Sequence, residues 1–361
     1  MNIEKIDKNF ASKNVTVVGD KASYAIPHEN FSLFGIYYDE ENHCFTRMPI
    51  HVADSVSEGV AALSTNTAGG RLCFTTNSSF IQLQATYNWF CNMRHMPLTG
   101  SSGFSLFELM GDKEVFVGVL APQAGANTGF SDGLSLKGGT LRKYVLYFPL
   151  YNNVQTLTLT LDKDATVEKL QPYKDVLPIL YYGSSITQGG CASRPDNTYQ
   201  ALICKRNHVD FINLGFAGNA RAETHMVDYL AQIDCSLFVC DYDHNAPTVE
   251  YLQNTVYPLY ERYRRVRKTT PILFITKPDF KVFSGDEMRH NVVKDAYEKA
   301  KALGDNNVYF LSGKEFFKDG NVCDYTVDNC HPTDYGFAEI AKKIYRKMQE
   351  IDKVFQGEND D

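Results

Sequence analysis

Four short segments in the second half of the chain carry residue types that together could hydrolyse an ester. They are residues 183–190, 215–219, 241–247 and 328–332. The first contains Ser185, and a serine hydroxyl becomes a useful nucleophile when a base takes its proton. The last contains His331, and imidazole is the side chain that most often takes such a proton near neutral pH. The combination indicates acyl transfer through a serine.

Asp328 lies close enough to His331 in the sequence for its carboxylate to fold back onto the imidazole ring. A carboxylate in that place orients the ring and stabilises the imidazolium that forms when the base takes a proton. Two other interpretations stay open. A lone histidine before Pro332 is commonly structural, and Asp328 precedes a helix that it could cap. Cys330 is a weaker candidate nucleophile, because neighbours in sequence rarely face each other.

The two middle segments offer donors for the negatively charged oxygen of a tetrahedral intermediate. Gly218 presents a backbone N–H with no Cβ in the way, and Asn245 presents a side-chain amide. Taken singly, each segment has a simpler interpretation: the Ser184-Ser185 pair as a helix N-cap, Gly218 as a turn glycine and Asn245 as an Asx turn. Asp243 and His244 suggest a metal, but adjacent side chains tend to point apart and no second cluster has ligand spacing. We therefore predict no metal and no cofactor.

The elements that must position these residues alternate between strand and helix. Apolar runs typical of buried strands cover residues 177–182, 211–214, 237–240, 272–276 and 308–311. Helical patterns cover residues 198–207, 223–233, 249–267, 286–303 and 335–351. Pro258 should kink or split the third of these helices. Such alternation predicts a parallel sheet covered on both faces, with ligands bound outside the carboxyl ends of its strands.

The first half of the chain has a β pattern from about residue 31 to residue 161. Residues 81–85 and 154–161 alternate apolar and polar side chains, as half-buried strands do. Glycine and asparagine clusters punctuate the stretch, which is typical of a sandwich or jelly roll. We place the domain boundary near residue 170, with a β-sandwich accessory domain over 1–170 and a catalytic domain over 171–361.

Composition narrows the class of protein. The 361 residues are 43% hydrophobic and 22% charged, with a net charge of -7, so we expect no nucleic-acid partner. The basic run at 262–268 is best explained as a solvated helix face. We expect no secretory leader at residues 1–8 and no bilayer-spanning segment. The nine cysteines include no C-x-x-C pair, which favours a reducing, cytoplasmic setting.

Taken together and in this order, the four segments resemble the SGNH hydrolase superfamily, also called GDSL esterases. The resemblance covers about residues 176–351. It implies a flavodoxin-like doubly wound sheet, a catalytic set of Ser185, Asp328 and His331, and an oxyanion hole made by Ser185, Gly218 and Asn245. The sequence departs from the name-giving motif at Ser184, where that motif has Asp. The form Gly-Ser-Ser-Ile-Thr is one that we associate with two-domain members.

Residues 101–107 resemble the Gly-x-Asp-Leu-Tyr element of a β-domain that precedes some SGNH hydrolases, although Ser105 and Phe107 replace its Asp and Tyr. Similar β-domains occur in two-domain carbohydrate esterases that remove acetyl groups from plant polysaccharides. The resemblance implies a short acyl ester as substrate, on oligosaccharides such as xylo- or manno-oligosaccharides. A short-chain phospholipid or platelet-activating-factor type acylhydrolase ranks lower, since no long apolar stripe flanks the motifs. A carbohydrate-binding protein with an inactive hydrolase half is disfavoured by the full set of catalytic residue types.

Trp89 is the single tryptophan and lies in a turn-rich stretch beside His95. Aromatic faces suit the apolar faces of sugar rings, and His95 could meet hydroxyl groups. Binding sites also form preferentially between domains. We therefore expect Trp89 and His95 to bind the sugar; the alternative is that Trp89 is a core residue of the sandwich.

Overall fold

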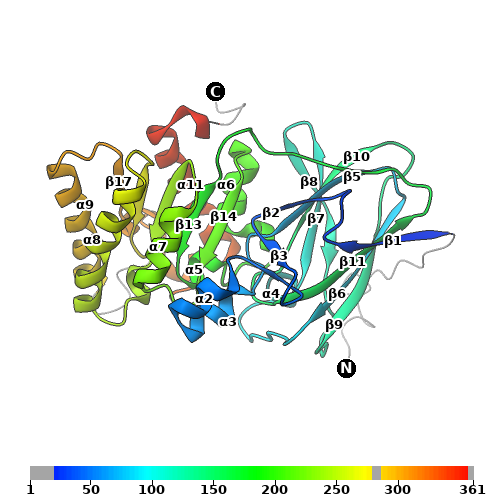
Figure 1. The fold of residues 1–361 in the computed structure, drawn as a ribbon, viewed down its shortest axis with the longest axis horizontal. Helices are drawn as coiled ribbons and strands as arrows, with labels where there is room; N and C mark the ends of the chain where they lie inside the picture. The colour runs from blue at the N-terminus through cyan, green and yellow to red at the C-terminus, as the bar shows by residue number, and fades with distance from the viewer. Residues whose placement is uncertain (1–19, 279–285, 357–361) are drawn as a thin grey trace.

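The computed structural model describes residues 20–278 and 286–356. Antiparallel sheets from the first part of the chain lie beside a helix-covered parallel sheet from the second part (Figure 1). Residues 1–8, on which the expectation of no leader depends, lie outside the described residues.

Five parallel strands form the sheet of the second half, in the spatial order β14-β13-β15-β16-β17. Their bounds are Ile179–Gly183 for β13, Phe211–Gly215 for β14, Leu237–Asp241 for β15, Ile272–Ile275 for β16 and Val308–Leu311 for β17. Counted along the chain, the order is 2-1-3-4-5, which is the flavodoxin-like arrangement. The doubly wound sheet is therefore confirmed, and its order reverses around β13, where such folds bind ligands.

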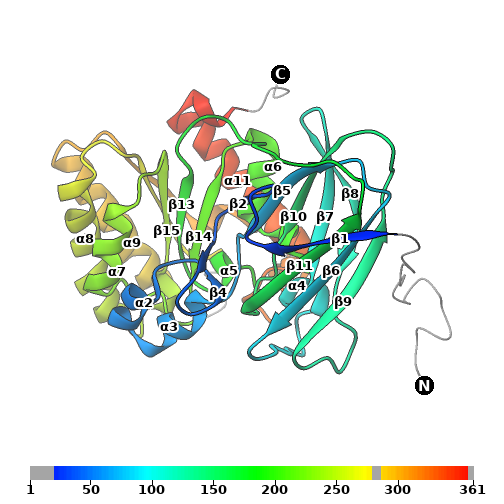
Figure 2. The same cartoon turned by 45° about the vertical axis from the view of Figure 1, so that its right-hand side comes forward.

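Helices cover both faces of this sheet (Figure 2). One face packs against α6 (Tyr199–Asn207) and α11 (Asp334–Ile351), and the other against α7 (Thr224–Gln232), α8 (Val249–Val266) and α9 (Asp286–Ala302). Alternate side chains of β13 follow this division. Tyr181 belongs to the core with α6 and α11, whereas Leu180 and Tyr182 belong to the core with α7, α8 and α9. Burial on both faces explains why these strands are continuously apolar.

Helix α8 continues through Pro258 as one helix and is not split there. A proline inside a helix removes one backbone hydrogen bond. The residues Leu252, Val256 and Leu259 are nevertheless buried in the core that α8 shares with the sheet. Packing on both sides of the proline therefore holds the helix together where its backbone is weakest.

The first half consists mainly of two antiparallel sheets. The first has the order β1 (Lys21–Ile26), β11 (Val154–Asp162), β6 (Phe80–Tyr87) and β9 (Gly129–Ser135). The second has the order β12 (Val167–Lys169), β5 (Arg71–Thr76), β10 (Arg142–Tyr147), β7 (Phe104–Met110) and β8 (Lys113–Leu120), with β2 (Ser32–Phe34) also paired to β5. Strands β3 (Tyr37–Asp39) and β4 (Cys44–Thr46) form a separate pair. A shared apolar core lies between the sheets, as the alternating pattern predicted.

The second of these sheets is buried on both faces along β10. Along β10 and just beyond it, Tyr144, Leu146 and Phe148 belong to the sandwich core. Val145 and Tyr147 belong instead to the core that includes α6 and α11. The period of two along a strand sends alternate side chains to opposite faces, so this strand joins the sandwich to the parallel-sheet half.

Two seven-residue helices interrupt the stretch in which the sequence pattern predicted only strands. They are α2 (Ile50–Val56) and α3 (Glu58–Ser64). Ala53 and Val60 are fully buried in the same core as Met226 of α7, and Figure 1 shows both helices on the side of the parallel sheet. Part of the first half of the chain thus completes the core of the second.

Two buried arginines of the first half bind β14 directly. Arg71 donates to a carboxylate oxygen of Asp210 at 2.7 Å and to the carbonyl of Phe211 at 2.9 Å. Arg47 donates to the carbonyls of Asn213 at 3.1 Å and Gly215 at 2.7 Å. The strand that leads to Gly218 is therefore fixed from both of its ends by the β-rich half.

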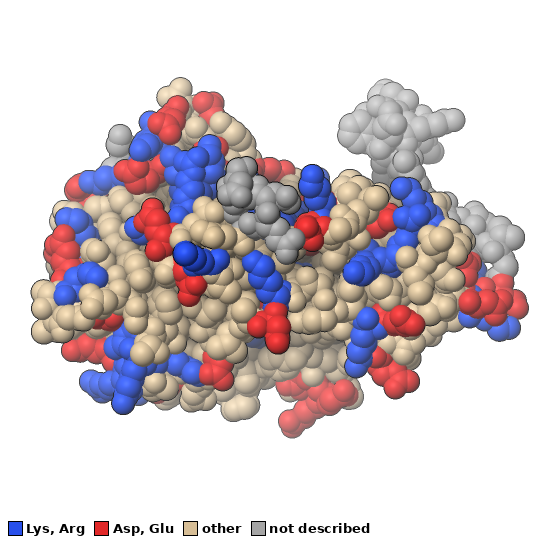
Figure 3. Space-filling view, turned by 90° about the horizontal axis from the view of Figure 1, so that it is seen from above, with Lys and Arg blue, Asp and Glu red and all other residues tan. Residues whose placement is uncertain are grey.

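On the face seen in Figure 3, basic and acidic side chains are interspersed. The described part of this face shows no broad field of one sign that would attract a polyanion. Among residues 20–278 and 286–356, no helix has both the length and the apolar character needed to cross a bilayer.

Candidate active site

Ser185 is the first residue of the short helix α5 (Ser185–Gln188), directly after β13. The preceding Ser184 is the N-cap, and its hydroxyl accepts a hydrogen bond from the N–H of Ile186 at 3.1 Å. The capping role that was the alternative for this serine pair thus belongs to Ser184. Gly183 is required at the turn, because a Cβ there would lie 2.2 Å from Oγ1 of Thr187. The tight turn places the hydroxyl of Ser185 at the carboxyl edge of the sheet.

A chain of two hydrogen bonds connects Ser185 to Asp328. Oγ of Ser185 lies 2.8 Å from Nε2 of His331, and Nδ1 of His331 lies 2.8 Å from Oδ2 of Asp328. These distances match a nucleophile, a base and a carboxylate that orients the base. The structure therefore brings together three residues that the sequence places in two distant segments.

The Asp328 loop is shaped by a residue in the left-handed region, since Asn329 has φ of 64°. Asparagine tolerates that conformation better than most residues. The turn lets Oδ1 of Asp328 accept the N–H groups of Cys330 at 3.1 Å and His331 at 2.7 Å. Partial burial opposes ionisation, but these hydrogen bonds and the His331 side chain lower the pKa of Asp328. Asp328 is thus held as a carboxylate facing the imidazole.

The two expected oxyanion donors lie on the loops that follow the strands on either side of β13. Gly218 follows β14, has φ of 70°, and a Cβ built there would have no atom within 4 Å. Asn245 follows β15 in a short 3-10 helix (Asp243–Asn245). Its Oδ1 accepts the N–H of Ala220 at 3.4 Å, which leaves Nδ2 as the donor. The open backbone at Gly218 and the oriented amide of Asn245 both suit an oxyanion.

Gln188 connects the Ser185 helix to the Gly218 loop and to the β-rich half. Its Nε2 donates to the carbonyl of Leu150 at 3.2 Å, and its Oε1 accepts the N–H of Ala217 at 3.0 Å. The hydroxyl of Tyr151 also donates to the carbonyl of Ser185 at 3.3 Å. These residues were not predicted from the sequence, although Gln188 lies within the motif that contains Ser185. They position the nucleophile and the loop together.

A buried acidic residue, Asp241, ends strand β15. Asp241 accepts a hydrogen bond from the hydroxyl of Tyr199 at 3.4 Å, and burial raises the pKa of Asp241 to about 7. Asp243 contacts Nδ1 of the adjacent His244 at 3.0 Å and accepts the N–H of Lys277 at 3.1 Å. The expectation that Asp243 and His244 point apart was wrong, because the 3-10 turn brings them together.

The loop between β6 and α4 (Leu98–Ser101) brings His95 close to His331. The ring of His95 lies 6.1 Å from the ring of His331, centroid to centroid. Trp89, on the same loop, is 41% exposed, so the interpretation of Trp89 as a sandwich core residue was wrong. Among the described residues, no contact is seen between Trp89 and His331. The β-rich half thus contributes His95 to the border of the site and presents Trp89 to solvent.

Comparison with known proteins gives a family for each of the two parts of the chain. Residues 177–349 match the GDSL-like Lipase/Acylhydrolase family. The C-terminal part of the chain is a GDSL-like acylhydrolase domain. Residues 24–167 match the N-terminus of SGNH hydrolase-type esterases. The protein is therefore a carboxylic ester hydrolase with an N-terminal domain characteristic of this class.

Solved structures share the whole two-part fold. A GDSL-like lipase from Bacteroides ovatus is 26% identical, with 91% of this chain and 98% of that chain covered and a TM-score of 0.82. A salicylyl-acyltransferase from a tetracycline biosynthetic pathway is 17% identical over 92% and 97%, with a TM-score of 0.74. An acetyl xylan esterase from Butyrivibrio proteoclasticus is 12% identical over 94% and 100%, with a TM-score of 0.59. A comparison with curated protein sequences finds no match.

Two cysteines lie near His331: Cys191, whose Sγ is close to a ring nitrogen of His331, and Cys330, which precedes it in the sequence. Burial, with Asp328 and Cys330 nearby, raises the pKa of Cys191 to about 12. A thiol so far from ionisation is a poor nucleophile. Cys330 meets Asp328 through its backbone N–H, whereas His331 contacts the hydroxyl of Ser185. Ser185 is the nucleophile that this geometry supports.

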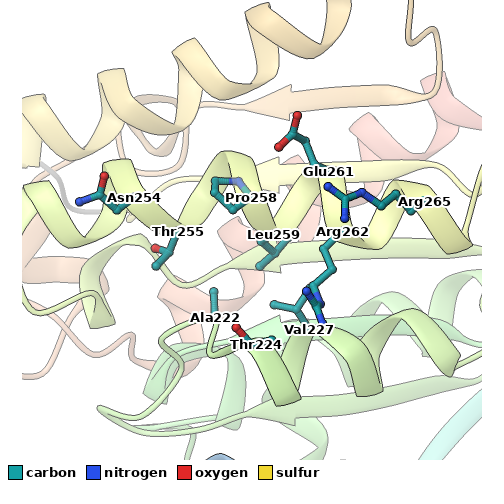
Figure 4. Close-up of a pocket in the computed structure, with 10 residues that line it drawn as sticks. All are labelled: Ala222, Thr224, Val227, Asn254, Thr255, Pro258, Leu259, Glu261, Arg262 and Arg265. Atoms are coloured by element: carbon teal, nitrogen blue, oxygen red, sulfur yellow. The ribbon is translucent and has the colours of Figure 1, made fainter.

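A pocket of about 200 Å³ opens between α7 and α8 (Figure 4). It is lined by Arg262 and Arg265 as well as by apolar residues such as Leu259. Arg262 is paired with Asp228. None of the residues of the Ser185 site lines this pocket, so it does not belong to the acylhydrolase chemistry.

Proposed function

We propose that this esterase removes acetyl groups from O-acetylated carbohydrates, such as xylo- or manno-oligosaccharides. The observation that carries the proposal is the hydrogen-bonded chain from Ser185 through His331 to Asp328, bordered by His95 of the β-rich half. A triad supplies the ester chemistry, and a second domain at its edge supplies surface for the alcohol part of the substrate.

In the proposed reaction, Oγ of Ser185 attacks the ester carbonyl while Nε2 of His331 takes its proton. Asp328 holds the imidazole in the correct tautomer and stabilises the imidazolium. The backbone N–H groups of Ser185 and Gly218 and the amide of Asn245 donate to the oxyanion. The imidazolium then protonates the departing sugar hydroxyl, leaving an acyl-enzyme. A water deprotonated by His331 releases the acid and restores Ser185.

The carbohydrate part of the proposal rests on the loop that carries Trp89 and His95. An exposed tryptophan is the side chain best suited to stack on a sugar ring. His95, close to His331, is placed to donate to or accept from a hydroxyl next to the ester. The acetyl xylan esterase with the same two-part fold acts on substrates of this kind by its name, which is compatible with an acetylated sugar here.

We further propose that residues 1–170 act as the accessory domain and residues 171–361 as the catalytic domain. The helices α2 and α3 would be the exception, since they pack into the catalytic core. None of the nine cysteines, all of which lie within the described residues, forms a disulfide, and six of them are buried, which supports the cytoplasm as the compartment.

Mass spectrometry of acetylated xylo- and manno-oligosaccharides after incubation with the protein tests the substrate. We expect loss of acetyl groups from at least one of the two, together with faster turnover of p-nitrophenyl acetate than of the butyrate and octanoate esters. Preference for octanoate would favour a lipid acylhydrolase instead. Oligosaccharide binding without turnover of any ester would mean that the hydrolase half is inactive.

A further inference from the structure

Three side chains that can each bind a metal meet at the edge of the proposed catalytic site. His95, Cys191 and His331 each offer one ligand atom, and these atoms all lie within 4.8 Å of one another. We propose that His95, Cys191 and His331 form a reversible binding site for Zn²⁺, and that the bound ion blocks the esterase. The claim that zinc blocks the esterase rests on the proposed function, whereas the claim that zinc binds does not.

The segments that carry the three ligands are tied to one another. The N–H of Cys191 donates to the carbonyl of Pro332, beside His331, at 3.2 Å. Oγ1 of Thr99, which follows His95 closely, donates to the carbonyl of Ser193 at 2.6 Å. The Cys191 turn is thus hydrogen-bonded both to the His331 segment and to the helix next to His95. A site assembled in this way has little chain entropy left to lose when an ion binds.

The ligand types suit zinc. Thiolate and imidazole are both ligand types that Zn²⁺ binds, with Zn–S of about 2.3 Å and Zn–N of about 2.0–2.1 Å. Tetrahedral geometry at those lengths puts ligand atoms roughly 3.3–3.8 Å apart, so side-chain shifts of about 1 Å complete the site. Binding replaces the S–H bond of Cys191 by a Zn–S bond and releases the proton to solvent. A water takes the fourth position.

The same hydrogen bonds that make His331 a base also prepare it as a ligand. Asp328 occupies Nδ1, so Nε2 is the nitrogen left for a metal. A carboxylate that holds the second nitrogen of a zinc-bound histidine is a recurring arrangement. Nε2 also holds Oγ of Ser185 at 2.8 Å. One nitrogen cannot serve both partners, so an ion on Nε2 removes the base from the reaction.

Sequence spacing gave no sign of this site, because its ligands come from three separate segments and two halves of the chain. Cys191 closely follows Ser185, and His95 lies in the first half. A role as a zinc ligand explains why Cys191, a poor nucleophile, lies beside His331. It also explains how the enzyme would respond to free zinc without any separate regulatory domain.

The claim that zinc binds is tested in the Ser185→Ala variant, which keeps all three ligands and needs no activity. We expect one Zn²⁺ per chain by calorimetry and, with Co²⁺ as a spectroscopic probe, a thiolate-to-metal absorption band. Adding Cys191→Ser should remove that band and weaken binding by at least about 100-fold, since even the loss of a partner behind a ligand costs about 10–100-fold. Cys323→Ser, at an exposed thiol, is the matched control and should change neither. No thiolate band, or equal affinity after Cys191→Ser, would overturn the site.

The claim that zinc blocks the esterase is tested with wild-type protein and p-nitrophenyl acetate. We expect activity to fall in proportion to zinc occupancy and to return when a chelator is added. Cys191→Ser alone should resist zinc: at a given zinc concentration it should retain a larger fraction of its own zinc-free activity than the wild type does. Zinc bound with undiminished turnover would overturn the blocking. If the wild type hydrolyses no ester at all, the proposed function fails, but the calorimetry of the Ser185→Ala variant still decides the zinc site.

Discussion

At the scale of single residues, Asn245 tests how the proposed oxyanion hole works. Asn245→Ala removes the Nδ2 donor and the contact of Oδ1 with Ala220. Because the bond to the oxyanion strengthens in the transition state, we expect kcat for p-nitrophenyl acetate to fall about 10²–10³-fold with little change in KM. Steady-state kinetics measure both. Asn254→Ala, on α8 outside the site, is the control and should leave kcat unchanged.

A rise in KM with kcat preserved would assign Asn245 to substrate binding instead. Asn245→Asp sharpens the distinction, because it keeps an oxygen toward Ala220 but loses the donor. A loss in the Asp variant at least as large as in the Ala variant would support the donor role, because the carboxylate has no donor and its charge opposes the oxyanion.

At this scale, residue types and order were enough to select Ser185, His331 and Asp328 as neighbours, and they contact one another as a hydroxyl, an imidazole and a carboxylate. Their catalytic roles remain predictions. The positions of His95 and Cys191 beside His331 could not be predicted, because they depend on how the two halves pack. The local sequence around each of these residues does not predict a contact between segments so far apart in the chain.

At the scale of elements, the parallel-sheet strands and their helices were predictable because their apolar runs are buried on both faces. The helices α2 and α3 were not. Each is short, and short helices depend on tertiary packing more than on their own propensity. Ala53 and Val60 are buried in the core that includes α7, and the sequence of the first half does not reveal this packing.

The end of β15 gives a prediction about stability and pH. Asp241 is buried, and its pKa is raised from 3.8 to about 7. Between these values the unfolded chain releases the proton while the folded chain keeps it, so the stability that Asp241 contributes falls as pH rises. Asn at this position stays neutral and still accepts from Tyr199. We therefore expect Asp241→Asn to gain thermal stability over the wild type as pH rises from about 4 to about 8.

Melting temperatures of both proteins across this pH range measure the effect. The difference between them should be smallest in acid and largest above neutrality. A difference that stays constant with pH would mean that Asp241 is ionised in the folded protein at all these values.

At the scale of the whole molecule, Arg71 tests the attachment of the two halves. It is fully buried and paired with Asp210. Removing one partner of a buried pair typically costs about 3 kcal/mol or more, so Arg71→Met should lower the urea midpoint clearly. Arg262→Met, which breaks the exposed pair with Asp228, is the control and should change the midpoint little. Equal effects of the two variants would mean that the Arg71 pair does not hold the halves together.

Trp89 tests the proposed role of the β-rich half in choosing the substrate. Trp89→Ala should lower kcat/KM for acetylated oligosaccharides about tenfold, the scale of one lost stacking contact, while p-nitrophenyl acetate, which has no sugar, is turned over as before. Leu141→Ala, at another exposed apolar residue of this half, should affect neither substrate. A parallel loss on both substrates with a lower melting temperature would assign Trp89 a structural role.

The most direct measurement for the account as a whole is active-site labelling with a fluorophosphonate, which reacts with serine nucleophiles that a histidine activates. Peptide mass spectrometry should find one label per chain, on Oγ of Ser185. Ser184→Ala should still be labelled and active, since Ser184 caps α5. Ser185→Ala should be neither labelled nor active, at an unchanged melting temperature. A label on Ser184, or ester turnover by Ser185→Ala, would contradict Ser185 as the nucleophile.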